Sequence, residues 1–113
     1  MISIIIPAFS PVMEWLEECL TALARQSYSD WEAIVIDDCS PSPIMSEDYS
    51  SIIDPGRLRV VRLEQNSGPG PARNAGVAVA RGGLLYMHDS DDWIEGNTLQ
   101  VLAEVLENEP GLD

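Results

Sequence analysis

The sequence predicts an α/β domain built on an open, mainly parallel sheet of about four strands, with helices on both faces. Short apolar runs rich in β-branched residues, such as residues 2–6 and 31–36, are typical of buried strands. Amphipathic helical patterns separate these runs, which favours parallel strands joined by right-handed crossovers. Polar residues gather where the apolar runs end, and open α/β sheets bind ligands beyond the carboxyl ends of their strands.

The first strand and the first helix are predicted within residues 2–26. The run 2–6 is stopped by Pro7, and its short, largely apolar sequence predicts a buried strand at the centre of the sheet. Ser10 and Pro11 predict a helix start, with the hydroxyl at the N-cap and the proline at the first helical position. The helix is expected to run from Val12 to about Gln26. Its predicted apolar face comprises Trp15, Cys19, Leu20 and Leu23, and its exposed face carries Glu14, Glu17 and Glu18.

The second strand, residues 31–36, runs directly into the pair Asp37-Asp38. A polar segment follows, and one weak helical turn is predicted within residues 45–53. Residues 54–56 (Asp-Pro-Gly) form a turn. Residues 58–63 then alternate apolar side chains with arginines, as expected for a strand nearer the edge of a sheet.

The second half of the chain repeats the alternation of helix and strand. A loop of glycines and prolines, residues 66–71, leads into a helix of small residues over 72–80 that can lie close against a neighbour. Gly82 is predicted near the C′ position that ends this helix. The fourth strand runs from Leu84 to Met87. A last amphipathic helix is marked by Leu99, Leu102, Val105 and Leu106.

Three carboxylates follow the fourth strand within four residues: Asp89, Asp91 and Asp92. Such a cluster is costly unless cations, hydrogen-bond donors or solvent meet it. Hard oxygen ligands of this kind suit Mg²⁺ or Mn²⁺, which commonly bind through one or two carboxylates together with substrate phosphates. A nucleoside diphosphate fits this description.

The composition limits the classes of function. The 113 residues, 45% of them hydrophobic, fit one domain spanning residues 1–113. The net charge of -13 excludes nucleic acid as a partner, since nucleic-acid binding requires a basic face. No run is long enough for a transmembrane helix and residues 1–3 lack the basic start of a signal peptide, which predicts a cytoplasmic protein. Cys19 and Cys39 fit no zinc or redox spacing and are expected to be free thiols, with Cys19 partly buried.

Other ligand sites fit these residues less well. The loop at Gly68 lacks the Lys-Ser/Thr pair of a P-loop, and it does not follow the first strand as a dinucleotide fingerprint does. Residues 89–94 fail as a calcium loop because Ile94 stands where the sharp turn requires glycine. A phosphatase-like aspartyl nucleophile lacks an obvious acid or lysine partner.

Four segments, each beside a predicted strand end, form a series along the chain. They are Ile4-Ile5-Ile6-Pro7-Ala8-Phe9, Val35-Ile36-Asp37-Asp38-Cys39-Ser40, Gly70-Pro71-Ala72-Arg73-Asn74-Ala75-Gly76 and Asp89-Ser90-Asp91-Asp92. In order and spacing they resemble the signatures of the family 2 glycosyltransferases with the GT-A fold, over essentially the whole chain. The resemblance implies a Rossmann-like GT-A half-domain that binds a nucleotide-diphospho-sugar.

The resemblance also implies roles in binding the donor. Pro7, Ala8 and Phe9 match the segment whose aromatic ring lies against the nucleobase. Asp38 matches the acid that accepts a hydrogen bond from the uracil ring N–H. Arg73 matches an arginine that lies near the base and the phosphates. Phe9 stands where many relatives have Tyr.

Asp89 matches the ribose-facing member of a DXD motif, and Asp91 matches the member that holds Mn²⁺ or Mg²⁺ on the diphosphate, with Asp92 as a supporting neighbour. The implied reaction is inverting transfer of a sugar, most simply from a UDP-sugar, to an acceptor hydroxyl. Family members run roughly twice this length, so the catalytic base and the acceptor site are expected beyond Asp113. By itself, this chain is therefore expected to bind donor but to transfer sugar poorly.

Several residues have a simpler structural interpretation. Asp37 is expected to cap the turn that follows it, and Asn74 to be a hydrogen-bonding residue at a helix start. His88 is expected to fill space under the site, and Trp93 to anchor a core or lid.

Two further expectations concern class and assembly. A non-catalytic nucleotide-sugar-binding or regulatory module is the alternative function, and a plain structural domain would bind no nucleotide. The fourth strand is expected to expose an edge at Leu84, Leu85 and Tyr86, which a homodimer could cover. Association with the inner face of a membrane would depend on parts outside this sequence, and the saccharide or lipid-linked acceptor is open.

Overall fold

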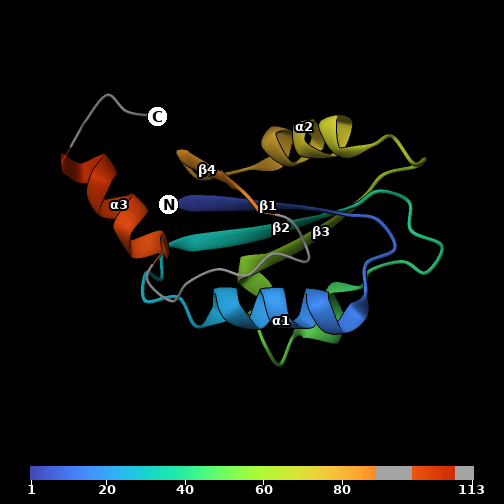
Figure 1. The fold of residues 1–113 in the computed structure, drawn as a ribbon, viewed down its shortest axis with the longest axis horizontal. Coiled ribbons are helices and arrows are strands. Elements are labelled where there is room, and N and C mark those ends of the chain that lie inside the picture. Colours follow the sequence, from blue (N-terminus) through green and yellow to red (C-terminus); the bar gives the residue numbers. More distant parts are fainter. Residues whose placement is uncertain (89–97, 109–113) are drawn as a thin grey trace.

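The computed structural model describes residues 1–88 and 98–108, and its elements alternate as the sequence predicts (Figure 1). Within these residues, four strands alternate with three α-helices, and two short 3-10 turns, η1 and η2, lie between the second and third strands. In chain order they are β1 (Ile2–Ala8), α1 (Met13–Ala24), β2 (Trp31–Asp37), η1 (Ser46–Tyr49), η2 (Pro55–Arg57), β3 (Leu58–Arg62), α2 (Pro69–Val79), β4 (Leu84–Met87) and α3 (Thr98–Asn108).

The strands form one parallel sheet in the order β3-β2-β1-β4. In register, Ile2 lies opposite Trp31 of β2 and Leu84 of β4, so β1 is central and β3 lies at an edge, which confirms both predictions. The chain builds outward from β1 to β3 and then crosses back to add β4 on the other side. The carboxyl ends of the strands lie on the right of Figure 1, and this is the end of the sheet at which open α/β proteins bind ligands.

Alternating side chains of the central strands supply two separate cores. Ile4, Ile6 and Val35 face α1, whose Leu16, Leu20 and Leu23 are fully buried. Ile5, Ile34 and Ile36 face the opposite side and pack with Ala72 of α2. Figure 1 shows α1 and α2 on opposite faces of the sheet, which confirms the predicted arrangement. Apolar side chains on both faces explain why the sequences of β1 and β2 are largely apolar and do not alternate with polar residues.

The start of α1 differs from the prediction. The helix begins at Met13, and its N-cap residue is Val12, which makes no side-chain capping bond. Ser10 instead adopts a left-handed conformation with φ 42°, so it is not the N-cap. Trp15 was predicted on the apolar face but is 52% exposed, and Leu16 is buried in its place. The buried stripe follows residues 16, 20 and 23, spaced by four and three, which turns residue 15 away from the sheet.

Both ends of α2 also differ from the prediction. The helix begins at Pro69 rather than at residue 72, because proline is well tolerated in the first turn. It ends at Val79, and the extended Ala80 follows, so Gly82 is not the left-handed cap that was expected. Gly82 has another reason to be glycine, since a Cβ there would lie 2.5 Å from the Met1 carbonyl oxygen and 2.8 Å from the Ser3 amide nitrogen.

A buried carboxylate ties the end of α2 to the sheet. Glu32 on β2 accepts hydrogen bonds from the Ser3 hydroxyl, the Arg81 amide and Arg59, at 2.7, 2.7 and 2.9 Å. Arg59 also donates to the Val79 carbonyl at the last residue of α2. Burial raises the pKa of the Glu32 carboxyl, but these donors outweigh burial and hold the pKa below its ordinary value of 4.5.

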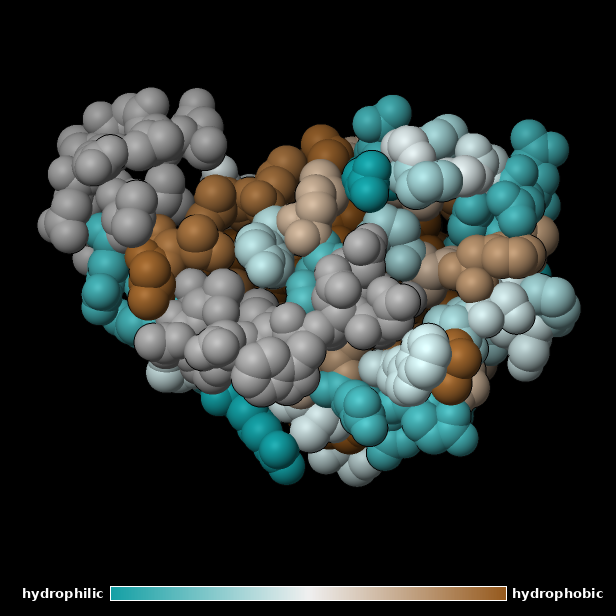
Figure 2. Space-filling view, viewed as in Figure 1, coloured by the Kyte–Doolittle hydropathy of each residue, from teal (hydrophilic) through white to brown (hydrophobic). Residues whose placement is uncertain are grey.

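The apolar edge predicted at the fourth strand is confirmed only in part. Within the described residues, β4 lies at one end of the sheet, and Leu85 is exposed on it, as is Met87. Leu84 and Tyr86, which were also expected to be exposed, are half-buried against the core. Figure 2 shows hydrophobic surface running along β4 beside α2. The homodimer that could cover this edge stays a prediction.

The remaining described parts fit their predictions. Leu99 of α3 is fully buried, and its amide donates to the Gln26 side chain after α1. Cys19 is buried and Cys39 partly buried, and the two do not form a disulfide. Within the described residues, none of the helices is both long and apolar enough to cross a membrane.

The small-residue helix α2 lies close against β1, as predicted, and this closeness can be tested at Gly76. A Cβ at Gly76 would lie 2.5 Å from Cγ2 of Ile5, which is fully buried and cannot move aside. We expect Gly76→Ala to lower the free energy of unfolding by about 1–3 kcal/mol through overpacking. Urea unfolding measures this change.

The matched control is Gly83→Ala, because a Cβ at Gly83 meets no described atom within 4 Å. Equal stability of the two variants would contradict the close packing of α2 on β1.

Candidate functional site

A small pocket opens at the carboxyl ends of β1 and β2, beside the first turn of α2. Its volume is about 160 Å³, below the roughly 300–1,000 Å³ typical of complete ligand sites, so it suits one part of a larger ligand. The Phe9 ring stands half exposed at this pocket. The lining residues are Pro7, Ala8, Phe9, Asp38, Pro69 and Ala72.

Asp37 organises the loop that follows β2. Its fully buried carboxylate accepts the amides of Ser40 and Ile44 at 2.9 and 3.0 Å and pairs with Arg62 of β3 at 2.8 Å. Burial raises the pKa of this carboxyl, but the Ile44 and Ser40 donors and Arg62 outweigh burial and hold the pKa below its ordinary value of 3.8. The predicted turn-capping role of Asp37 is confirmed.

Ser40 connects the loop after β2 with the loop after β1. Its hydroxyl accepts the Ser10 amide at 2.8 Å and also bonds to the Asp37 carboxylate. Ser10 and Cys39 adopt positive φ values of 42° and 61°, which are uncommon for residues other than glycine. Such conformations persist where surrounding contacts enforce them, and they cluster at functional sites. The Ser10–Ser40 bond thereby fixes the loop that carries Phe9.

Asp38 is turned toward the pocket and toward the start of α2. Its two carboxylate oxygens accept the Ser67 and Gly68 amides at 2.8 and 2.9 Å, and its own amide donates to the Ala8 carbonyl. Only 5% of the residue is exposed. An ionised carboxylate has about four acceptor positions, so Asp38 can still accept a hydrogen bond from a ligand.

The other predicted site residues lie apart from the pocket or outside the described residues. Arg73 is exposed on α2, one residue beyond Ala72, and forms no ion pair within residues 1–88 and 98–108. Asp89, Asp91 and Asp92 lie outside the described residues, as does Trp93. Asn74 is exposed on α2, five residues after Pro69, where the helix begins, so it is not at the helix start.

His88 is the last described residue before the acidic segment that begins at Asp89. Its amide donates to the Ile5 carbonyl at 3.0 Å, which extends the pairing of β4 with β1. Its ring is buried and stacks on Tyr86, as expected for a residue that fills space under a site. In the part of the chain that the structure describes, no group of three His, Cys, Asp or Glu residues could hold a metal ion.

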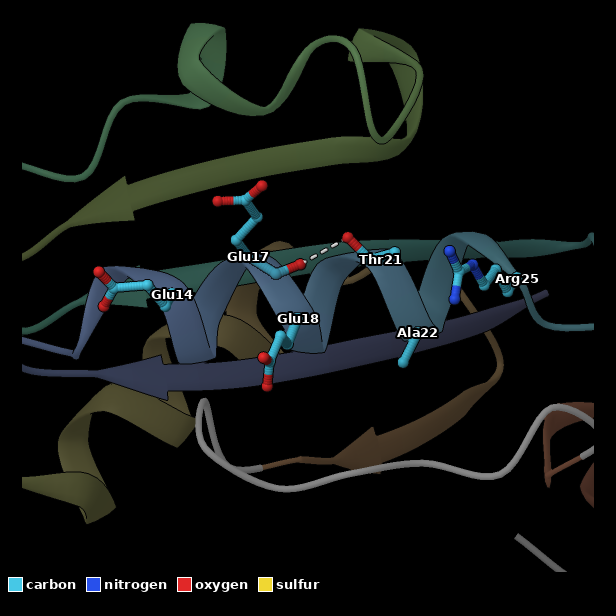
Figure 3. A pocket seen from close by; sticks show the side chains of 6 residues that line it. All are labelled: Glu14, Glu17, Glu18, Thr21, Ala22 and Arg25. Carbon is cyan, nitrogen blue, oxygen red and sulfur yellow. Dashed lines mark hydrogen bonds between the residues drawn. The ribbon is translucent and has the colours of Figure 1, made fainter.

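A larger hollow of about 520 Å³ lies along the outer face of α1 (Figure 3). Glu14, Glu17 and Glu18 line it with a single cation, Arg25. Figure 3 shows Glu17 and Glu18 pointing to opposite sides of the helix, so these carboxylates do not converge on a ligand. An acidic surface also repels phosphates, and we assign no function to this hollow.

Sequence reasoning missed the residues that hold the pocket together. Arg62 lies opposite Asp37 in the strand register, but that register is not readable from the sequence. Ser40 follows Asp37 by three residues, a spacing typical of a side chain that caps its own turn, and this signal could have identified it. Ser67 and Gly68 bind Asp38 through their backbone amides alone. Every residue except proline has such an amide, so the residue types do not indicate this contact.

The fold and the pocket together define an α/β protein with a pocket at the carboxyl ends of its two central strands, the end of the sheet at which open α/β proteins bind ligands. The sequence matches Glycosyl transferase family 2 over residues 3–112, and the chain belongs to this family.

Two curated relatives illustrate the likeness. The uncharacterized glycosyltransferase EpsJ of Bacillus subtilis is 37% identical over 109 residues, which are 95% of this chain and 30% of EpsJ. The poly(ribitol-phosphate) beta-N-acetylglucosaminyltransferase TarS of Staphylococcus aureus is 34% identical over 110 residues, 93% of this chain and 18% of TarS. The chain therefore spans less than a third of the length of either relative.

Solved structures confirm the Rossmann-like GT-A fold. The crystal structure of S. aureus TarS 1-349 in complex with UDP-GlcNAc has a TM-score of 0.84 at 33% identity, over 95% of this chain and 31% of that one. The mannosyltransferase PcManGT from Pyrobaculum calidifontis, in complex with GDP-Man and Mn²⁺, has a TM-score of 0.84 over 98% of this chain and 33% of that one. Its identity is 23%, so this second likeness concerns the fold alone.

The lowered pKa values of Asp37 and Glu32 predict a loss of stability in acid. The unfolded carboxyls bind protons at higher pH than the folded ones, so protonation favours unfolding. We expect the free energy of unfolding to fall as the pH drops through the ordinary values of 4.5 and 3.8 and below. Asp37→Asn should cost about 1–3 kcal/mol at pH 7, because an NH₂ group replaces one of the two acceptor oxygens and leaves a buried donor unpaired, and the cost should shrink in acid.

Urea unfolding between pH 7 and pH 3 provides this measurement. The control is Asp48→Asn, at an exposed aspartate of η1. Its free energy of unfolding at neutral pH should equal that of the unaltered protein. An Asp37→Asn variant as stable as this control at pH 7 would refute the anchoring role of Asp37.

Proposed function

We propose that this chain is the donor-binding half of a glycosyltransferase that transfers a sugar from a nucleoside-diphosphate donor, a UDP-sugar, to an acceptor hydroxyl with inversion and with the help of a divalent metal. The observation that carries the proposal is the pocket at the strand ends, where an exposed aromatic ring, apolar walls and one carboxylate meet. The likeness to TarS, solved with UDP-GlcNAc, supports the choice of a UDP-sugar.

The pocket suits a nucleobase better than a phosphate. Phe9 offers an exposed ring on which a planar base can stack, and Pro69 and Ala72 provide apolar contact from the other side. Asp38 lies between these walls and can accept a hydrogen bond from a ring N–H such as that of uracil. A carboxylate in this position disfavours an anion, so the phosphates must lie outside the pocket.

The diphosphate is assigned to Arg73 and to a divalent metal. Arg73 is exposed on α2 just beyond the pocket wall, and its planar guanidinium suits phosphate oxygens. Asp91 is the proposed ligand of Mn²⁺ or Mg²⁺, and Asp89 the proposed partner of the ribose. Their carboxylates fit such hard ions, and the segment that carries them begins directly after His88, beside β1. When bound, the metal would stabilise the charge of the leaving diphosphate.

The transfer step requires groups that residues 1–113 are not proposed to supply. A catalytic base must lie within hydrogen-bond reach of the acceptor hydroxyl, opposite the leaving diphosphate. We assign this base and the acceptor site to parts of the enzyme beyond this sequence, since the relatives are more than three times as long. The chain alone is then expected to bind donor with little or no transfer.

Titration calorimetry with UDP tests the donor site. We expect UDP to bind in the presence of Mn²⁺ and to bind at least about tenfold more weakly when a chelator removes the metal. Asp91→Ala should lower the affinity for UDP by a similar factor even with Mn²⁺ present, because the metal ion would lose its protein ligand.

The control for this experiment is Asp48→Ala, which removes an equal charge from the exposed surface of η1. If Asp91→Ala binds UDP and Mn²⁺ as tightly as this control does, the metal assignment fails. Absence of UDP binding in every condition would count against the proposed function itself.

A second titration tests base stacking through two exposed aromatic residues. Phe9 lines the pocket, whereas Trp15 lies on the outer side of α1, and the two are 50% and 52% exposed. We expect Phe9→Ala to weaken UDP binding by about 1–3 kcal/mol, the typical contribution of stacking on one base. Trp15→Ala should leave the affinity unchanged, and equal losses in both variants would exclude a specific role for Phe9.

A further inference from the structure

One wall of the pocket is attached to the rest of the molecule through Asp38. Pro69 and Ala72 form this wall at the start of α2, and Pro7, Ala8 and Phe9 form a second wall at the end of β1. The residue directly before Pro69 is Gly68, whose amide donates to Asp38 at 2.9 Å, and the Ser67 amide donates to the other oxygen at 2.8 Å.

The same loop also holds the second residue of that wall. The Ala72 amide donates to the Gly68 carbonyl at 3.2 Å, so the first turn of α2 closes on the glycine that Asp38 binds. The distance between the two walls therefore depends on two amide–carboxylate bonds. We call Asp38, Ser67 and Gly68 the carboxylate clamp.

Gly68 adopts a backbone conformation that other residues avoid. Its φ of 89° and ψ of 172° fall in a region occupied almost only by glycine. A Cβ at Gly68 would meet no described atom within 4 Å, so a substitution acts through the backbone and not through a clash. A residue with a side chain before proline prefers extended angles with negative φ, which would turn the Gly68 amide away from Asp38.

We propose that Ser67 and Gly68 are positioning residues for the nucleobase: through the carboxylate clamp, they set the separation of α2 from the end of β1 and so determine the affinity of the pocket. The inference rests on the proposed function, since it assumes that the pocket takes the base of the donor. Neither residue lines the pocket, so their effect must be transmitted through Asp38, Pro69 and Ala72.

The test compares Gly68→Ala with Gly83→Ala, using UDP with Mn²⁺ and uridine alone as probes. Gly68→Ala strains the clamp, whereas Gly83 lies outside the clamp and a Cβ there meets no described atom within 4 Å. We expect Gly68→Ala to weaken the binding of both probes by about tenfold or more, and Gly83→Ala to change neither affinity by more than about twofold. Uridine is essential here because it lacks phosphates.

Thermal unfolding of each variant separates positioning from stability. The titrations are made well below the unfolding temperature, where a residue that only stabilises the fold would leave the affinity of the folded protein unchanged. Unchanged uridine affinity in folded Gly68→Ala would overturn the inference while leaving the proposed function intact. If the unaltered protein binds neither UDP nor uridine, the proposed function fails and the positioning role fails with it.

Amide hydrogen exchange on the unaltered protein tests the clamp without any substitution, in case Gly68→Ala does not fold. The Gly70 amide serves as the internal reference, because it lies in the first turn of α2 and has no partner among the described residues. The Ser67 and Gly68 amides should exchange at least about tenfold more slowly than the Gly70 amide. When uridine is bound, their exchange should become slower still. Exchange as fast as that of Gly70 would overturn the inference.

Discussion

Three buried carboxylates on and directly after β2 hold the parts of this molecule together. Glu32 binds the residues that end α2, Asp37 binds the loop after β2 and β3, and Asp38 binds the loop that begins α2. A buried charge is stable only when it is paired and hydrogen-bonded, so each carboxylate requires its neighbours to stay in place. Helix α2 is thereby fixed at both ends, and the pocket lies at one of them.

The pairing of basic side chains with these buried carboxylates limits how this acidic chain can bind an anionic ligand. The sequence has 6 basic residues against 19 acidic ones, and Arg59 and Arg62 are already paired with Glu32 and Asp37. The first turn of α2 adds few amide donors, because Pro69 and Pro71 lack an N–H and the Gly68 amide is bound to Asp38. These restrictions favour a neutral, planar group inside the pocket, with phosphates outside it near Arg73 and a metal.

The order and type of the elements were predictable, whereas several of their ends were not. Strands β1 and β2 are predictable because each is a short run rich in β-branched residues. This composition is readable in the local sequence, and it is typical of strands buried on both faces. The start of α1 and the exposure of Trp15 could not be read in the same way, because the tether from Ser10 to Ser40 is made across 30 residues of sequence. Pro7, Ala8, Phe9 and Asp38 were predicted to share a site, and the structure brings them into one pocket.

The sequence by itself determined the alternation of strands and helices, the central place of β1 and the polar character of the strand ends, since these follow from periodicity and composition. Only the tertiary structure decided what each of two adjacent aspartates binds. Asp37 points to Arg62 and its own loop, while Asp38 points to Ser67 and Gly68, from positions that look equivalent in the sequence. Successive side chains leave a strand in opposite directions, and their partners are set by strand register and crossover, which are properties of the folded sheet.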